Sequence, residues 1–444
     1  MWVDLLLQVL TKNNRDQQAH NPPNSTLEMT STNYSSSAPA IPVAVPLPVQ
    51  VQVDDNDTPT APAVRPTLAN ANSQFRKSNY NLPSSRRNGE MMIVPEHRIQ
   101  QLVDQGYTRG LAQSLAQTIK AFPLRIWVVD NSGSMQATDG HRFVRTKRSD
   151  NVKVVSCSRW NEIKECVEYH AQMASALEAP TTFRMLNDPG CGPGSQQFGV
   201  AETNLDPNVL QEEVDRAVAI MSTAQPGGVT PLIAHIEEIR NAVFELTPKL
   251  HADGCRVSVI LATDGLPTDE RGYGGAAIQR QFLEALRNLE GLPIWLVIRL
   301  CTDEDKVVDF YNDLDNQLEL SMDVLDDWQE EAKEIYEHNP WLNYALPLHR
   351  LREMGYHHRV FDMLDERPFT HEEIREFCNL ILADDKTPKL PDPSADWKDF
   401  AKELKKLLAR EKNPFNPIDN RTAPWINMKK LEKKYGDKKW YSKF

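Results

Sequence analysis

The sequence predicts an α/β fold built on a doubly wound, mostly parallel six-stranded sheet. Between about residues 124 and 327, apolar runs rich in β-branched residues alternate with helical patterns, as in sheets whose strands are joined by helices. Two runs, Ile-Trp-Val-Val at 126–129 and Val-Ser-Val-Ile-Leu-Ala at 257–262, are continuous or nearly so. Such runs are typical of parallel strands that are buried on both faces, so we expect helices on both sides of the sheet.

Each element of this domain follows from its own pattern. Strands are expected at 124–130, 182–186, 196–200, 256–263, 293–300 and 318–325. Helices are expected between them, at about 159–178, 208–222, 231–246, 275–290 and 303–316. The segment 139–157 is charged and then alternates apolar with polar residues, which indicates a hairpin inserted directly after the first strand. These elements define a domain over residues 123–327.

Residues 1–92 differ from this domain in composition. They hold 10 of the 30 prolines, one glycine and several Asn/Ser/Thr clusters, without apolar periodicity. Such a segment cannot bury enough apolar surface to offset the entropy that it would lose on ordering. We therefore expect a disordered, partly polyproline N-terminal arm.

Residues 93–122 are expected to form a helical hairpin that is broken at Gly106-Tyr107. The phrase Leu-Val-Asp-Gln-Gly-Tyr at 102–107 resembles the first two helices of a ubiquitin-associated domain, in which a Gly-aromatic turn presents a ubiquitin-binding loop. The third helix of that domain is missing, because strand-like sequence starts at Leu124. The alternative is a hairpin that packs on the next domain as a brace.

Beyond residue 327 the sequence divides by charge. Residues 328–384 are expected to form an acidic helical extension, and Thr370 followed by Glu373 predicts a capping box at the start of its last helix. Residues 300–384 carry 22 acidic and 7 basic side chains, whereas residues 385–444 carry 16 basic and 9 acidic side chains and six prolines. We expect residues 385–444 to be a basic tail that lies across the acidic helices as a strap, with contact to nucleic acid or anionic lipid as the alternative.

The composition of the whole chain narrows the function classes. Its 444 residues carry a formal net charge of −12, which argues against nucleic-acid binding by the protein as a whole. No apolar run approaches the roughly 20 residues that a membrane crossing needs, and the N-terminal segment lacks the basic region of a secretory signal. The six cysteines lack paired spacing, which fits a reducing compartment. We expect a cytoplasmic protein without a transmembrane segment.

One motif carries chemistry, and it follows the first strand. The sequence Val-Val-Asp130-Asn-Ser132-Gly133-Ser134-Met places an acidic residue and two hydroxyls at alternate positions. Gly133 allows the turn to fold back, so that both serine hydroxyls point toward one place.

Two further loops bring oxygen donors to the same edge of the sheet. Thr230 lies in the loop Gly-Gly-Val-Thr-Pro-Leu, where Pro231 fits the first helical position and leaves Thr230 at or near the N-cap. Asp264 follows a buried strand in the sequence Leu-Ala-Thr-Asp-Gly. Five oxygen-bearing side chains, Asp130, Ser132, Ser134, Thr230 and Asp264, are thus expected on one rim.

The chemistry of this set favours a particular class of metal. All five donors are hard oxygens, which select Mg²⁺, or alternatively Mn²⁺ or Ca²⁺, over zinc. Two carboxylates and three hydroxyls barely balance a divalent charge and are too few to close an octahedron. The metal therefore keeps an open position, for which a carboxylate of a partner protein is a better ligand than water.

This combination resembles the von Willebrand factor A (VWA) domain and its metal-ion-dependent adhesion site (MIDAS). The resemblance covers about residues 124–327 and includes all five positions. It implies that the serine and threonine hydroxyls contact the metal, and that Asp130 and Asp264 act directly or through water. It also implies a Rossmann-like sheet of strand order 3-2-1-4-5-6 with one antiparallel edge strand, and a ligand at the carboxyl ends of the strands.

Three functional hypotheses follow. The first is an intracellular VWA-type protein-binding module, a scaffold or assembly subunit rather than an enzyme, in which Mg²⁺ coordinates an Asp or Glu side chain of a partner protein. The second is a metal-assisted enzyme or enzyme subunit, for which Asp139 and His141 are the nearby candidates for a general base. The third is a ubiquitin-pathway adaptor that uses the hairpin at 99–119.

Weaker signals favour structural roles. A histidine and cysteine group has irregular spacing and does not predict a zinc site; its members are His338, His349, His357, His358 and Cys378. The aromatic residues Trp328, Trp341 and Tyr344 are expected in the core of the extension.

Overall fold

The central sheet has six strands, and four of its five strand pairings are parallel. The computed structural model that shows it describes residues 80, 82, 95–145 and 152–436. The strands are β1 (Leu124–Val129), β4 (Thr181–Met185), β5 (Gln197–Val200), β6 (Val257–Thr263), β7 (Ile294–Leu300) and β8 (Met322–Leu325). They lie in the order β5-β4-β1-β6-β7-β8, with β5 antiparallel at one edge. This confirms the expected α/β fold with a mostly parallel six-stranded sheet, and only β8 is clearly shorter than expected.

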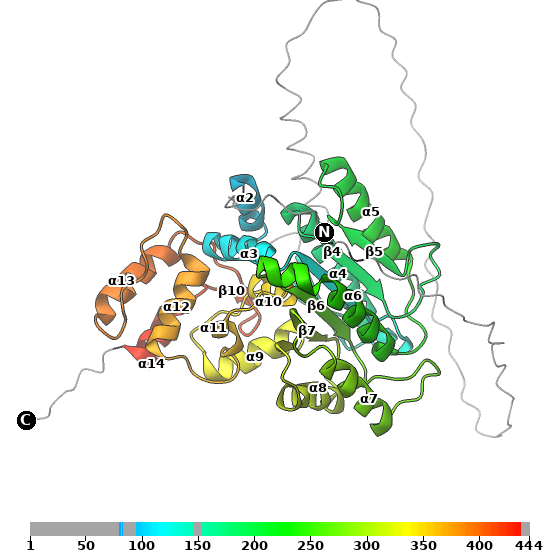
Figure 1. Ribbon diagram of the computed structural model, residues 1–444. Coiled ribbons are helices and arrows are strands. Elements are labelled where there is room, and N and C mark those ends of the chain that lie inside the picture. The colour runs from blue at the N-terminus through cyan, green and yellow to red at the C-terminus, as the bar shows by residue number, and fades with distance from the viewer. Residues whose placement is uncertain (1–79, 81, 83–94, 146–151, 437–444) are drawn as a thin grey trace, which may run out of the picture. The chain divides into compact units, whose positions relative to one another are not determined.

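Helices cover both faces of this sheet (Figure 1). The helices on it are α4 (Arg159–Leu177), α5 (Pro207–Thr223), α6 (Leu232–Asp253), α7 (Ala276–Arg287) and α8 (Asp305–Gln317). Successive residues of β1 point to opposite faces, so Trp127 packs in one apolar core with α4 and α5, and Val128 packs in another with α6, α7 and α8. We call this three-layered part, residues 123–327, the sheet domain.

The expected insertion after β1 is an antiparallel hairpin. Its strands are β2 (Gly140–Arg145) and β3 (Val152–Cys157), and residues 146–151 lie outside the described part of the chain. A Cβ placed on Gly140 would lie 2.9 Å from the backbone nitrogen of Arg159. The insertion therefore begins and ends at nearly the same point, next to the first turn of α4.

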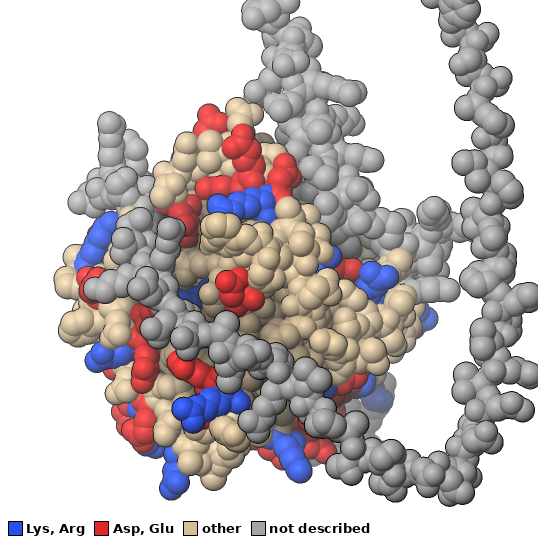
Figure 2. Space-filling view, turned by 90° about the vertical axis from the view of Figure 1, so that its right-hand side faces the viewer, with Lys and Arg blue, Asp and Glu red and all other residues tan. Residues whose placement is uncertain are grey.

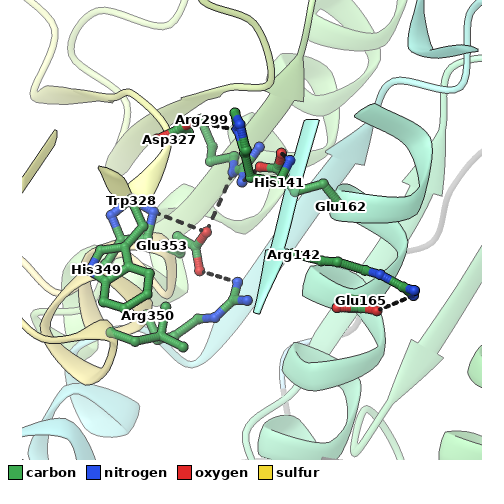
Figure 3. A pocket seen from close by; sticks show the side chains of 11 residues that line it. His141, Arg142, Glu162, Glu165, Arg299, Asp327, Trp328, His349, Arg350 and Glu353 are labelled. Carbon is green, nitrogen blue, oxygen red and sulfur yellow. Dashed lines mark hydrogen bonds and ion pairs between the residues drawn. The ribbon is translucent and has the colours of Figure 1, made fainter. Parts of the chain in front are cut away.

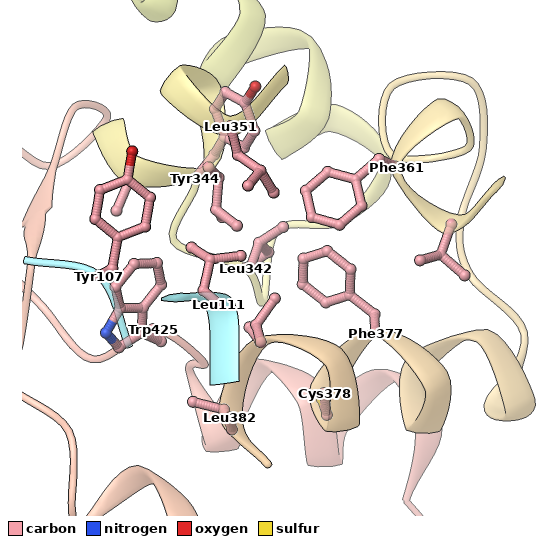
Figure 4. Close-up of a cluster of buried hydrophobic side chains, with 14 of the residues drawn as sticks. Tyr107, Leu111, Leu342, Tyr344, Leu351, Phe361, Phe377, Cys378, Leu382 and Trp425 are labelled. Atoms are coloured by element: carbon pink, nitrogen blue, oxygen red, sulfur yellow. The ribbon is translucent and has the colours of Figure 1, made fainter. Parts of the chain in front are cut away.

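The helices before and after the sheet domain share one further apolar core. They are α2 (Glu96–Asp104), α3 (Arg109–Ala121), α9 (Trp328–His338), α10 (Leu346–Glu353), α11 (Arg359–Asp362), α12 (His371–Leu382), α13 (Trp397–Leu408) and α14 (Met428–Tyr435). Figure 4 shows Leu111 of the N-terminal hairpin in one cluster with Phe377 of α12 and Trp425 of the C-terminal segment. The three segments that the sequence treats as separate, 93–122, 328–384 and 385–444, thus contribute to a single core, which we call the extension core.

Residues 397–435 of the expected basic tail are folded and pack against the rest of the extension. Trp397, Phe400 and Leu404 lie on one face of α13 and are buried in the extension core, and a short β hairpin (β9, Phe415–Asn416; β10, Arg421–Thr422) follows. The apolar positions of α13 recur every three or four residues, but its many lysines give the segment the composition of a solvated tail. Contact with the acidic helices does occur, because Lys430 Nζ on α14 donates to Tyr336 Oη on α9 at 2.7 Å.

Two predictions for the extension are confirmed. Thr370 caps α12, with Glu373 accepting a hydrogen bond from the Thr370 backbone nitrogen at 2.8 Å, so the capping box is present. Trp328, Trp341 and Tyr344 are buried, as expected of core residues.

The N-terminal hairpin packs as a brace. Tyr107, in the turn between α2 and α3, is only 3% exposed, and its hydroxyl lies 3.0 Å from that of Tyr169 on α4. On the other side, Ser114 donates to the carbonyl of Leu380 on α12 at 3.2 Å. The turn therefore lacks the exposed aromatic residue that a ubiquitin-binding loop would present.

The remaining expectations concern the surface and the arm. No helix in the described ranges combines the length and the apolar character that a bilayer crossing requires. On the face shown in Figure 2, acidic and basic side chains are scattered around a broad area that carries few of either, without the continuous basic surface of a nucleic-acid interface. The arm expected at 1–92 lies outside the described residues except for Tyr80 and Leu82, and Tyr80 is buried against the α6–α8 side of the sheet domain.

Candidate metal centre

Asp130 and Asp264 meet because the strands that carry them are neighbours. β1 and β6 pair in parallel, with Val129 opposite Ala262, and both acidic residues follow at the carboxyl ends of these strands. The Asp130 backbone nitrogen donates to the Ala262 carbonyl at 2.8 Å, which extends the strand pairing by one residue. Thr263 Oγ1 then donates to Asp130 Oδ2 at 2.7 Å and fixes that carboxylate.

The two serines connect the carboxylates through their hydroxyls. Asp130 Oδ1 accepts from the backbone nitrogen of Ser132 at 2.8 Å, which holds the turn that precedes a short 3₁₀ helix, Gly133–Gln136. Ser132 Oγ lies 2.9 Å from Ser134 Oγ, and Ser134 Oγ donates to Asp264 Oδ1 at 2.8 Å. Asp130 and Asp264 are buried whereas Ser134 is exposed, so this line of oxygens runs from the interior to the surface.

Thr230 joins the same group from a third loop. A Cβ placed on Gly265 would lie 3.9 Å from Thr230 Oγ1 and 4.0 Å from Ser134 Oγ, so both hydroxyls lie beside Gly265. The Thr230 loop is held by Thr268, whose Oγ1 accepts from the Thr230 backbone nitrogen at 3.0 Å. Pro231 occupies the N-cap of α6 rather than its first helical position. The helix therefore starts one residue later than expected. The structure thus brings together all five predicted side chains.

The electrostatics of the pair favour a bound cation. Burial, and then the Asp264 carboxylate, raise the pKa of Asp130 to about 6, and burial raises the pKa of Asp264. A divalent cation between the two carboxylates would offset the cost of burying two like charges, because each carboxylate would gain an opposite charge at short range. Carboxylate and hydroxyl oxygens are donors that Mg²⁺ and other hard cations accept, so the donor types are compatible with the expected ion.

The sequence did not reveal Arg159, which lies next to this group. Its Nη1 donates to Asp264 Oδ2 at 3.0 Å, its Nε and Nη2 donate to Asp139 at 2.7 and 2.6 Å, and its Nη2 also donates to Glu304 at 3.1 Å. Arg159 is the first residue of α4 and is buried. It neutralises Oδ2 of Asp264 and leaves Oδ1 to accept from Ser134.

Neither proposed general base stands free beside the five oxygens. Asp139 binds Arg159, and that ion pair lowers its pKa. His141 Nδ1 lies 3.5 Å from Asp327 Oδ2, and both residues line a cavity that none of the five oxygen-bearing residues borders (Figure 3). This geometry gives the metal-assisted enzyme hypothesis no support.

A second polar cluster lies between the sheet domain and the extension core. Glu353 of α10 is fully buried; its Oε2 accepts from Arg350 Nη1 at 2.7 Å, and its Oε1 lies 3.4 Å from Arg299 Nε. Cys166 and His170 of α4 approach the same carboxylate. Burial raises the pKa of Cys166 to about 12 and lowers the pKa of His170 to about 4.

Sequence reasoning missed this cluster apart from His349, which it placed in a different histidine group. Cys378 of that group is buried among apolar side chains of the extension core, away from this cluster. The available signal was the spacing: Cys166 precedes His170 by four residues, and His349 precedes Glu353 by four residues. Residues four apart share one face of a helix.

Comparison with protein-family models and with curated proteins finds no match to this chain.

Proposed function

We propose that the sheet domain is a VWA-type protein-binding module. In this proposal a MIDAS formed by Asp130, Ser132, Ser134, Thr230 and Asp264 binds Mg²⁺, and the metal coordinates an Asp or Glu side chain of a partner protein. Mn²⁺ or Ca²⁺ could take the same place. The protein would act as a scaffold or assembly subunit in the cytoplasm, where its six free cysteines would remain reduced.

The observation that carries the proposal is the hydrogen-bonded line of oxygens from buried Asp130 to exposed Ser134. Buried carboxylates are costly unless they are paired or bind metal, and the charged group that acts most strongly on Asp130 is a second carboxylate, that of Asp264. The strand order supports the proposal as well, because it is the order that the VWA resemblance implies, with the donors at the carboxyl edge where open α/β sheets bind ligands.

A partner carboxylate suits this arrangement better than a small substrate does. Only Ser134 among the donors is exposed, so the metal would face solvent on that side. The protein supplies few charged ligands, which leaves the metal electrophilic toward an incoming anion. Asp130 and Asp264 would hold the metal in place, and the metal would supply an electrophilic position for the carboxylate of a partner.

The metal part of the proposal is tested by thermal unfolding of the full chain with and without millimolar Mg²⁺ or Mn²⁺. Selective binding to the folded state at 100 times the dissociation constant adds about 2.7 kcal/mol of stability. The variants Asp130→Asn and Asp264→Asn should lose the shift. Asp188→Asn is the matched control, because Asp188 is exposed on the neighbouring loop after β4. A shift that survives in both site variants would refute the site.

The open position is tested with a small carboxylate. Mn²⁺ bound to the protein speeds the relaxation of water protons through its exchangeable water ligands. N-acetyl-aspartate amide should displace one of these waters and reduce that effect in a saturable way, and N-acetyl-asparagine amide should not. If both compounds leave the relaxation unchanged while Mn²⁺ stays bound, the site holds a metal but does not capture carboxylates.

A further inference from the structure

Two helices present four metal-ligating side chains to one another at the buried junction between the sheet domain and the extension core. Cys166 and His170 lie on one face of α4, and His349 and Glu353 lie on one face of α10. Each of the four side chains is at most 2% exposed. Figure 3 shows His349 and Glu353 turned toward each other at the wall of a cavity.

Two of the donor separations at Glu353 match those of a tetrahedral site. At zinc bond lengths of about 2.0–2.3 Å, neighbouring ligand atoms stand about 3.3–3.6 Å apart. Cys166 Sγ lies 3.5 Å from Glu353 Oε1, and His349 Nε2 lies 3.4 Å from the same oxygen. His170 Nε2 lies 3.0 Å from Glu353 Oε2. The ligand atoms of Cys166, His170 and Glu353 all lie within 4.8 Å of one another.

An unsatisfied atom points to a ligand at this place. His349 Nε2 is buried and lacks a hydrogen bond of good geometry, because the Glu353 oxygen that it faces is 3.4 Å away. Its other ring nitrogen, Nδ1, lies 3.4 Å from the Tyr344 hydroxyl, which orients the ring. A metal-binding histidine is held in this way, with one nitrogen on the metal and the other on a fixed polar group.

The charges of the surroundings tolerate a divalent ion. The cavity beside the cluster, of about 30 Å³, is lined by four carboxylates and three guanidinium groups, and therefore by one net negative charge. A divalent cation together with one thiolate adds one positive charge and makes the whole neutral. Arg350 Nη1 now donates to Cys166 Sγ at 2.9 Å and to Glu353 Oε2 at 2.7 Å, so it stands where the ion would bind. Its side chain is 16% exposed and lines the cavity, so zinc binding would require it to move away from Cys166 and Glu353.

We propose that Cys166, His170, His349 and Glu353 form a structural zinc site that fastens α10 to α4. One thiolate, two imidazoles and one carboxylate are the donors that zinc prefers over magnesium. Four protein ligands leave no open position, which is typical of a structural site rather than a catalytic one. Zinc binding would release the thiol proton of Cys166 to solvent, since a coordinating thiol must be ionised. This site is independent of the five oxygens at the sheet edge.

The test uses the full chain, stripped with a chelator and then offered one equivalent of Zn²⁺ or Co²⁺. We expect about one zinc per chain after gel filtration, and with cobalt a thiolate-to-metal charge-transfer absorption. Cys166→Ser and His349→Gln should lose both signals. The matched controls are Cys378→Ser, in the extension core, and His357→Gln, which is exposed and lies outside the cluster; both should retain metal.

Further variants separate the possible outcomes. Arg350→Gln should bind zinc several-fold more tightly, because it removes the competing cation, and Asp130→Asn should leave the zinc content unchanged. Absence of retained zinc and of the cobalt signal in the parent chain would overturn the proposal, and this readout does not depend on any variant folding. Metal retained in both Cys166→Ser and His349→Gln would also overturn it.

Discussion

Arg159 Nη1 donates to Asp264 Oδ2 at 3.0 Å, and both side chains are buried. The guanidinium thus holds one oxygen of a carboxylate whose other oxygen accepts from Ser134. Asp264 therefore has a fixed orientation before any metal binds, and part of its charge is already neutralised. Arg159 both prepares the proposed metal site and competes with the metal.

Arg159→Met should lower the stability of the metal-free protein by about 3–5 kcal/mol, because it leaves the Asp264 carboxylate buried without its partner. Since the competing cation is gone, the stabilisation by Mg²⁺ should be larger in this variant than in the parent. Urea unfolding with and without Mg²⁺ measures both effects. Arg142→Met is the control: its ion pair with Glu165 is exposed, so the change should cost at most about 1 kcal/mol. Loss of the Mg²⁺ effect in folded Arg159→Met would show that Arg159 supports metal binding instead.

Stability should depend on pH through Asp130. Because its folded-state pKa is raised to about 6, the folded protein takes up a proton in the range from about pH 6 down to about pH 4, where the unfolded chain does not. The metal-free protein should therefore lose up to about 3 kcal/mol as the pH rises through this window. Asp130→Asn should remove much of this slope and be more stable than the parent near neutral pH.

Magnesium should show the opposite trend, because it must displace the proton that Asp130 holds. Its stabilising effect should grow as the pH rises past about 6, in chemical unfolding followed at several pH values. Equal slopes in the parent and in Asp130→Asn, without metal, would contradict the assignment of the titration to Asp130.

Gly355→Ala should weaken the packing of the extension on the sheet. Gly355 has a φ of +81°, and a Cβ there would clash with the side chain of Ser258 on β6, 2.9 Å from its Cβ. Gly106 also has a positive φ, of +101°, but a Cβ there would meet nothing within 4 Å. Gly106→Ala should cost about 1–2 kcal/mol from backbone strain alone. Gly355→Ala should cost clearly more in urea unfolding, and equal costs would show that the contact relaxes freely.

Phe400→Ala tests whether the C-terminal segment belongs to the extension core. Phe400 is fully buried, so its loss should cost about 3–5 kcal/mol in the main unfolding transition. Lys402→Ala, on the exposed side of the same helix, should change stability by less than about 0.5 kcal/mol. A separate early transition in Phe400→Ala, with the main one unmoved, would mean that α13 folds independently of the rest.

The sequence predicts the sheet well because its signals are local. Continuous apolar runs mark β1, β6 and β7 to within about a residue of their observed ends, and the capping residue Thr370 marks the start of α12. The same holds for the five oxygens at the sheet edge, since parallel strands place their carboxyl ends side by side. Whether these oxygens hold a metal remains a prediction.

Long-range pairings were not predictable in this way. Arg159 and Asp264 are 105 residues apart, and no local sequence pattern at either residue predicts that they pair. The four-residue spacings of Cys166 with His170 and of His349 with Glu353 occur on many helices. They indicate a cluster only once the packing of α4 on α10 is known. In α13 the lysines obscured an apolar face that becomes evident once a partner surface is known.

The inserted hairpin offers a place to build a sensor. Its base is closed by the backbone hydrogen bond from Arg159 to the Ala137 carbonyl, at 2.9 Å, and by the ion pair of Arg159 with Asp139. Extra residues between β2 and β3 would add little closure entropy, because that cost grows only with the logarithm of loop length. A fluorescent reporter spliced into the hairpin would be joined to the residue that contacts Asp264, so a change of its emission on adding Mg²⁺ would test whether the oxygen cluster binds the ion.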